Sequence, residues 1–353
     1  MVIQLQPKVV MLVKSSPIFH AIAAVALVSQ VSAEAATSAV KTSPVKISPA
    51  RGTFWNDPGK ISTRDLYNGA GGRTREPASG RFVFVSEDDG DSNPKFTVRD
   101  RNGVEWKVKL GDEVRSETAA TRFLWAVGYF CDEDYFLPSI QVVNMPRLRR
   151  GQSYVGPAGV VRNVRLERRP SDAKMVDSWK WKDSSLKGMR ELNGLRVMMT
   201  LMNNWDLKDS NTAVYAQTAG GRIGPERHVY AVSDMGATFG SSGYSIPSRK
   251  SDLHSFARSR FITKVTPEYV DFASPGRPAM LSVFAPPVFV RRMQTRSIGK
   301  QIPRQDVKWI ARLLSQLTPS QIRSAFRAAG YSAEEIEGFS RVMETRIALL
   351  TEL

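Results

Sequence analysis

A short segment in the middle of the chain and a second one shortly after it hold side chains that suit phosphoryl transfer. Asp206, Lys208 and Asn211 form the pattern D-x-K-x-x-N, and Asp234 follows in the pattern D-x-G. Such a transfer needs a carboxylate to orient the attacking hydroxyl and accept its proton, and an amide oxygen and a second carboxylate to hold Mg²⁺ or Mn²⁺. A nearby ammonium stabilises charge on the transferred group. We therefore predict catalytic roles for Asp206 and Lys208, and metal ligation by Asn211 and Asp234.

The elements expected around these segments bring the four side chains together. An apolar stripe predicts a helix over 188–203, before the first segment. Strands are predicted over 212–217 and 227–234, on either side of a Gly-Gly turn. Because a hairpin returns its far end to its near end, we expect Asp234 to lie beside Asn211 and both to reach one metal ion.

The residues upstream predict a small sheet with one helix. Alternating and short apolar runs predict strands over 81–86, 95–99, 104–110 and 136–143. The helix is expected to begin near Ser116, a good N-cap. Two capping boxes, at Thr318 and Ser332, predict helices that close the chain over 303–353, with an apolar stripe that packs in the core. The fold class indicated is α+β, a small antiparallel sheet followed by a mostly helical part.

These patterns together resemble the protein kinase-like fold. The run from Asp206 to Asn211 resembles the catalytic loop of protein kinases from its aspartate onward, and Asp234-Met-Gly236 resembles their D-F-G motif. The loop lacks the usual His-Arg pair, which is more similar to the atypical branch of HipA-type, phosphoinositide and secreted kinases. The resemblance covers about residues 81–240. It implies two lobes, an N-lobe over 81–145 and a C-lobe over 146–353.

The same resemblance implies ATP as the cofactor and points to residues that would bind it. In this family a lysine on the strand before the single helix binds the nucleotide phosphates and pairs with a helix glutamate. Lys109 occupies that position, although Lys107 lies on the same face of the strand. Glu117 is the expected partner of the lysine and Glu113 is the alternative. The loop that would cover the phosphates supplies two further candidate contacts, Gly90 and Ser92.

The beginning of the chain has the pattern of a secretory signal peptide. Lys8 and Lys14 precede an apolar run over 18–28, and small residues end the pattern at Ala33. We predict a signal peptide over 1–33, then a linker and irregular segment over 34–80 that is flexible up to residue 60. The protein is expected to be exported to the periplasm or the extracellular space, with no transmembrane span after cleavage. The apolar run is shorter than the roughly 20 residues that cross a bilayer, and the alternative is an anchor formed by an uncleaved segment.

Composition limits the remaining classes of function. The net charge of +16 favours an anionic partner, such as an acidic or envelope-associated acceptor. No arginine-rich tract, zinc spacing or recognition helix predicts specific nucleic-acid binding. The single cysteine, Cys131, excludes a disulfide within the chain and a cysteine-rich metal site. Besides an exported phosphotransferase, two alternatives are open: an inactive pseudokinase or envelope-surface binding protein on the same fold, and a polyanion-binding protein of unrelated fold.

Overall fold

The computed structural model describes residues 52–88, 90, 93–168, 173–219, 222–240, 250–273 and 297–353. The predicted signal peptide, the first part of the predicted linker and Ser92 lie outside the described residues. The described residues belong to one compact unit. Among them, no helix is both long and apolar enough to cross a membrane.

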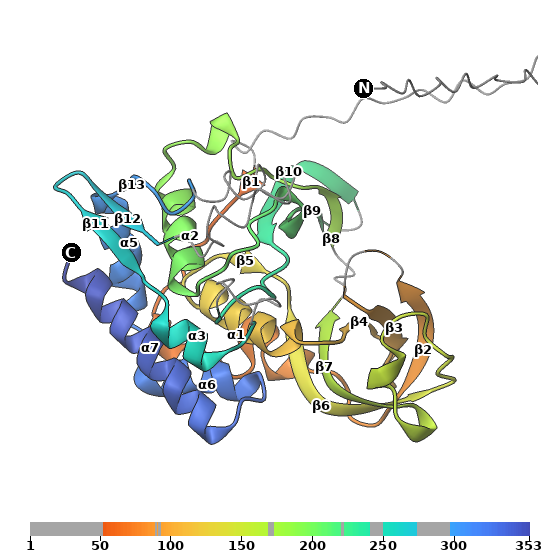
Figure 1. Ribbon diagram of the computed structural model, residues 1–353. Helices are drawn as coiled ribbons and strands as arrows, with labels where there is room; N and C mark the ends of the chain where they lie inside the picture. The colour runs from red at the N-terminus through yellow and green to blue at the C-terminus, as the bar shows by residue number, and fades with distance from the viewer. Residues whose placement is uncertain are drawn as a thin grey trace, which may run out of the picture. The chain divides into compact units, whose positions relative to one another are not determined.

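A closed barrel forms one part of this unit (Figure 1). Its strands are β2 (Arg81–Asp88), β3 (Lys95–Arg99), β4 (Glu105–Lys109), β6 (Asp134–Val143) and β7 (Val160–Arg168). The inward side chains make a hydrophobic cluster of their own that includes Phe96, Trp106 and Val108. We expected an antiparallel sheet, but β2 and β6 pair in parallel, and this pair closes the barrel. The other neighbouring strands are antiparallel, as expected.

Strand β7 was not predicted, and it extends the barrel beyond the expected boundary at residue 145. It pairs with both β4 and β6. Asn163 has a positive φ of 50°, and the buried apolar positions change phase there, from Val161 to Val164 and Leu166. Regular alternation of apolar and polar residues is the sequence signal of a half-buried strand. Because the alternation is interrupted at this point, the sequence pattern does not predict β7.

A second sheet contains the hairpin expected from the sequence. Strands β9 (Thr212–Ala219) and β10 (Arg222–Val232) form that antiparallel hairpin. The sheet is completed by β8 (Ala173–Asp177) on β9, and by β1 (Gly52–Thr53) and β5 (Phe130–Cys131) on β10. The predicted strands over 212–217 and 227–234 are thus present, with shifted ends.

The expectation of a flexible linker up to residue 60 needs correction from residue 52 onward. Gly52 and Thr53 pair in parallel with His228 and Val229 of β10. Phe54 is buried and packs edge-on against Trp179, with 5.3 Å between the ring centroids. The segment is rich in small and polar residues, and this composition indicated a flexible linker. A few aromatic and apolar side chains nevertheless anchor it in the core.

Helices make up most of the rest of the unit. They are α1 (Glu113–Ala126), α2 (Arg190–Leu201), α3 (Leu253–Arg258), α5 (Arg304–Leu314), α6 (Pro319–Ala328) and α7 (Ala333–Thr351). A small sheet of β11 (Ile262–Val265), β12 (Tyr269–Phe272) and β13 (Ile302–Pro303) lies between α3 and α5 in the sequence. The helix α1 begins at Glu113, so Ser116 is not its N-cap as predicted; the Ser116 hydroxyl is buried and donates to the carbonyl of Gly236 (2.7 Å).

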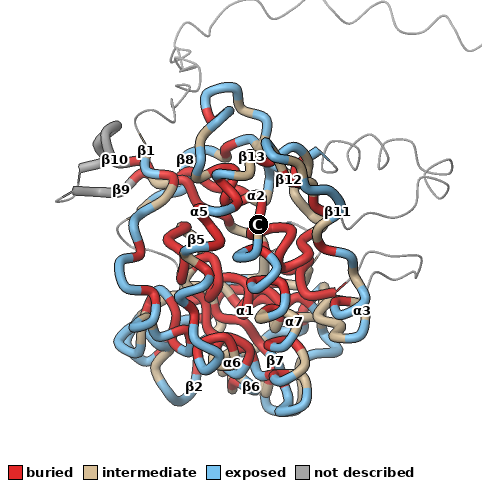
Figure 2. Tube along the Cα trace, turned by 90° about the vertical axis from the view of Figure 1, so that its left-hand side faces the viewer, coloured by how far each residue is buried: buried red, intermediate tan, exposed pale blue. Residues whose placement is uncertain are grey.

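The largest hydrophobic cluster lies among the helices and the second sheet. Both predicted capping boxes are present, at the starts of α6 and α7. The apolar stripe of α7 is buried as expected, and Phe339 packs against Phe239, Phe256 and Phe326. Almost all of α1 is buried between this cluster and the barrel (Figure 2). The helix that carries Glu113 and Glu117 is therefore central to the packing.

Candidate functional site

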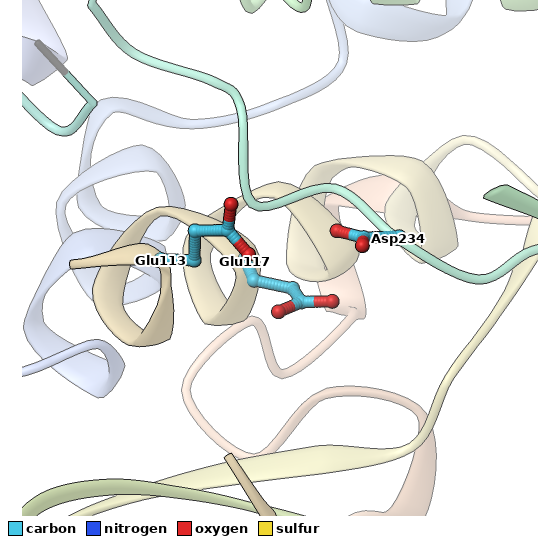
Figure 3. Close-up of side chains that lie close together, drawn as sticks. All are labelled: Glu113, Glu117 and Asp234. Atoms are coloured by element: carbon cyan, nitrogen blue, oxygen red, sulfur yellow. The ribbon is translucent and has the colours of Figure 1, made fainter. Parts of the chain in front are cut away.

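Lys109, the last residue of β4, binds carboxylates from two separate parts of the chain. Its Nζ lies 2.7 Å from Glu113 Oε2 and 2.8 Å from Glu117 Oε2, both on α1. The same atom lies 3.4 Å from Asp234 Oδ1, beyond the end of β10. Glu113 and Glu117 are one helical turn apart and face the strand that leads into their helix. Figure 3 shows the two glutamates on one helix, with Asp234 on a different segment.

Burial and charge act in opposite directions on this cluster. The Lys109 side chain is only 3% exposed, and its burial opposes the ammonium form. The carboxylates of Glu117, Asp234 and Glu113 outweigh that effect and raise the pKa of Lys109 above its ordinary value. Burial likewise opposes ionisation of Asp234, yet Lys109 and the backbone N–H of Gly236 hold its pKa below the usual range. The lysine is therefore charged and faces an ionised Asp234, whereas burial raises the pKa of Glu117 to about 7.

The carboxylates of the cluster surround an ammonium group. Oxygens of Glu113, Glu117 and Asp234 lie within 4.8 Å of one another, a spacing that a cation could bridge. The Nζ of Lys109 is within hydrogen-bonding distance of both glutamates. A dication at the same point would meet a like charge. Of the three carboxylates, Asp234 is the most exposed, at 40% of its side chain, and is the one that can also face a ligand.

The loop after α2 arranges Asp206, Lys208 and Asn211 around one carboxylate. The side-chain oxygen of Asn204 accepts from the Asp206 N–H (2.9 Å) and fixes the turn into the loop. Lys208 Nζ lies 2.7 Å from Asp206 Oδ2. Asn211 Nδ2 donates to the carbonyl of Asp206 (2.7 Å) and lies 3.4 Å from its Oδ2. The Asn211 side-chain oxygen accepts instead from the Ser210 hydroxyl (3.5 Å).

The β9–β10 hairpin brings Asp234 back beside Asn211, as expected from the sequence. The carbonyl of Asn211 accepts from the N–H groups of Ser233 (3.0 Å) and Asp234 (3.4 Å). The side chains then diverge: Asn211 bonds Asp206, and Asp234 bonds Lys109. The structure thus joins the loop at 206–211 to the lysine of the barrel through a single residue, Asp234.

Gly90, between β2 and β3, is bonded by an arginine that the sequence analysis did not single out. Arg150 Nη2 donates to the carbonyls of Gly90 (2.9 Å) and Asp88 (3.3 Å). Asp88 Oδ1 in turn accepts from the N–H of Gly90 (2.9 Å). These hydrogen bonds fix the position of Gly90 near the end of β2. Ser92, the other residue predicted to contact the phosphates, lies outside the described residues.

Sequence reasoning missed Arg165 of β7, a second cation beneath the cluster. Its Nη1 lies 3.3 Å from Glu117 Oε1 and 3.1 Å from Asp134 Oδ2, and its side chain is 3% exposed. It pairs with Lys109 across the two strands. Glu117 is thus held between Lys109 and Arg165. The signal was hidden because β7 itself was not recognised.

The structure also decides between the residues that the sequence left as alternatives. Glu113 and Glu117 both bind Lys109, so neither replaces the other. Lys107 is 26% exposed and lies 3.9 Å from Glu167, away from the helix carboxylates. Lys109, which could have been a solvent-exposed strand residue, is instead buried under α1.

Comparison with known proteins gives weak likenesses in structure only. No protein-family model matches the sequence, and no curated protein matches it. The crystal structure of a Helicobacter pylori proinflammatory kinase, CtkA, is 12% identical over 78% of this chain and 98% of that chain, with a TM-score of 0.43. The crystal structure of the golgi casein kinase is 10% identical over 82% of this chain and 78% of that chain, with a TM-score of 0.28. Both neighbours are kinases, but likeness at these TM-scores supports no statement about this chain.

Proposed function

We propose that this chain is an ATP-dependent phosphotransferase with a two-lobed, kinase-like fold of the atypical branch. One observation carries the proposal: Asp234 binds the buried Lys109 through its side chain and Asn211 through its backbone. In the proposed active state the Lys109 ammonium, the Asp234 carboxylate and the Asn211 amide would face one space, which requires the Asn211 side chain to turn from Asp206. In this proposal the N-lobe consists of the barrel, including β7, and helix α1. The C-lobe consists of the second sheet and the remaining helices.

The donor atoms in this space fit Mg²⁺ or Mn²⁺. Hard dications bind carboxylate and amide oxygens, and Asp234 and Asn211 supply one of each. Asp234 and Asn211 would hold the metal ion, which would supply positive charge against the phosphates. Lys109 would bind the nucleotide phosphates while Glu113 and Glu117 hold its ammonium in place. Gly90 and Ser92 would lie over the phosphates.

Asp206 is the group proposed to accept the proton of the acceptor hydroxyl. As the acceptor hydroxyl attacks the terminal phosphorus, its O–P bond forms while the bond from phosphorus to the nucleotide diphosphate oxygen breaks. The hydroxyl proton passes to Asp206 Oδ2, and the electron pair of the broken bond stays on the diphosphate. Lys208, 2.7 Å from the same oxygen, would then turn to the transferred phosphoryl group.

A second candidate is a pseudokinase that binds the nucleotide or another anion without turnover. It is favoured by the contact between Lys208 Nζ and Asp206 Oδ2, which occupies the oxygen that would accept the proton. The two candidates predict the same binding but differ in transfer. Phosphate transfer to any acceptor, or slow hydrolysis of ATP, would decide for the enzyme.

Replacing Asp234 is expected to abolish metal-dependent nucleotide binding. Asp234→Ala removes a metal ligand and a partner of Lys109 together, so the affinity for ATP with Mg²⁺ or Mn²⁺ should fall by about tenfold or more. Titration calorimetry on the full chain measures this. Asp209→Ala is the matched control, because Asp209 lies in the same loop but bonds the N–H of Trp181 (3.2 Å) and should not alter binding. Equal affinity in the parent and Asp234→Ala would contradict the proposed metal site.

Export and the acceptor class belong to the same proposal. We infer from the pattern over 1–33 that the protein leaves the cytoplasm, with an uncleaved anchor as the alternative. The net charge of +16 supports an acidic or envelope-associated acceptor rather than a specific nucleic acid. Mass spectrometry of the mature protein would test cleavage after Ala33.

A further inference from the structure

The turn between α6 and α7, residues 329–332, lies against the helix that carries both glutamates of the site. Helix α1 packs on α6 (Figure 1). Arg115 of α1 lies in sequence between Glu113 and Glu117, and its guanidinium stacks over the Tyr331 ring, 3.9 Å from the centroid. The same guanidinium forms an ion pair with Glu335 in the first turn of α7. One arginine therefore ties the two glutamates' helix to the end of the chain.

Tyr331 also reaches the segment that follows Asp234. Its side chain is buried, and its hydroxyl forms a hydrogen bond with the hydroxyl of Ser251. The Ser251 N–H donates to the carbonyl of Thr238 (3.1 Å), and the Thr238 hydroxyl donates to the carbonyl of Ser116 on α1 (3.3 Å). The neighbouring Lys250 forms an ion pair with Glu113. A closed ring of contacts thus joins the turn, the segment after Asp234 and the first turns of α1.

The same turn meets the barrel. Gly330 has a φ of +72°, which favours glycine, and a Cβ placed there would lie 2.0 Å from the ring of Phe136 on β6. A second close approach occurs inside the ring of contacts, where a Cβ on Gly236 would lie 2.6 Å from the Glu113 side chain. The turn therefore contacts the barrel, α1 and the segment after Asp234, the three parts that surround Lys109.

We propose that the α6–α7 turn is a brace that holds α1 where Glu113 and Glu117 bind Lys109, and that Arg115 is its positioning residue. Arg115 touches neither the nucleotide nor the metal in the proposed site. Arg115 acts by fixing the rotation of α1 about its axis and its position along that axis. Both glutamates lie on α1 within one helical turn of Arg115, so their positions depend on it. The effect of the brace on turnover rests on the proposed function, whereas its effect on α1 does not.

Arg115→Ala tests the brace through hydrogen exchange in the full chain. Loss of the stacking and the ion pair should raise the exchange rate of amides in the first two turns of α1 about tenfold, because local opening becomes easier. Amides in the middle of α7 should keep the rates of the parent. Arg115→Lys, which keeps a cation over the Tyr331 ring and near Glu335, should restore most of the protection. Arg323→Ala is the control. It removes the exposed ion pair of Arg323 on α6 with Glu337 on α7, and should leave the exchange rates of α1 unchanged.

Nucleotide turnover gives the second readout. In Arg115→Ala, kcat should fall about tenfold with a smaller change in KM, since Lys109 is misplaced more often while the other ligands stay. If Arg115→Ala fails to fold, Glu335→Gln removes only the charge of the pair and preserves the capping box, and should give a smaller increase in α1 exchange.

The outcomes separate the two proposals. A parent that transfers no phosphate refutes the phosphotransferase, and the exchange measurement still decides the brace. Exchange in α1 that is the same in the parent, Arg115→Ala and Glu335→Gln overturns the brace, whatever the turnover. Raised exchange in α1 with unchanged kcat overturns the effect of the brace on the site, because the position of Lys109 would then not depend on Arg115.

Discussion

Asp206→Asn should lower phosphate transfer by about 10²–10⁴-fold while leaving binding of the metal nucleotide near that of the parent. The carboxamide has nearly the shape of the carboxylate but cannot take the proton of the acceptor hydroxyl. The proposed metal ligands, Asn211 and Asp234, are not altered. The backbone carbonyl of residue 206, which accepts from Asn211, is also preserved. The loss should therefore appear in kcat and not in affinity.

Single-turnover transfer and calorimetry on the same preparation measure these two quantities separately. Asp209→Asn is the control, since it makes the same chemical change three residues away at an exposed position. A variant at 206 as active as the parent means that another group accepts the proton. A variant that loses binding as strongly as turnover means that Asp206 holds the metal instead.

Lys109→Met should both destabilise the protein and abolish nucleotide-dependent activity. The ammonium is buried among carboxylates at 2.7 Å and 2.8 Å, and removing one partner of a buried ionic cluster costs about 3–5 kcal/mol. Methionine fills most of the volume of the lysine stem, so the loss reflects charge rather than a cavity. Urea unfolding of the full chain measures the free energy of unfolding.

The destabilisation of Lys109→Met should depend on pH. In the parent, burial raises the pKa of Glu117 to about 7, whereas Lys109 outweighs burial at Glu113 and Asp234 and helps to hold their pKa values below the ordinary range. Without the lysine the folded pKa values lie above the unfolded ones, so the folded state binds protons that the unfolded state releases. The loss in free energy of unfolding relative to the parent is therefore largest at pH values above the raised folded pKa values. It should shrink as pH falls from 8 to 5.

Lys107→Met is the matched control for this experiment. Lys107 lies two residues earlier on the same strand, is partly exposed and is 3.9 Å from Glu167. We expect it to change stability by no more than about 1 kcal/mol, with little dependence on pH. If the two variants behave alike, the buried cluster around Lys109 does not have the energetic role assigned to it.

Local chemistry along the chain made part of the site predictable. Asp206, Lys208 and Asn211 are close because they share one loop, and a hairpin of ordinary length must return Asp234 to Asn211. The capping boxes of α6 and α7 were equally readable, because each depends on residues three positions apart. The loop and the capping boxes follow from the sequence because few backbone dihedrals separate the groups that meet. Asp234 meets Asn211 because the two strands of the hairpin pair along their length.

The sequence by itself determined four strands of the barrel, the helix after them, the side chains of the 206–211 loop and the hairpin that follows it. Only the tertiary structure decided that Glu113 and Glu117 both bind Lys109, that Arg165 lies beneath them, and that Arg115 meets Tyr331. The physical reason is distance along the chain. Arg115 and Tyr331 meet because α6 packs on α1, and no local period or spacing in the sequence records that packing.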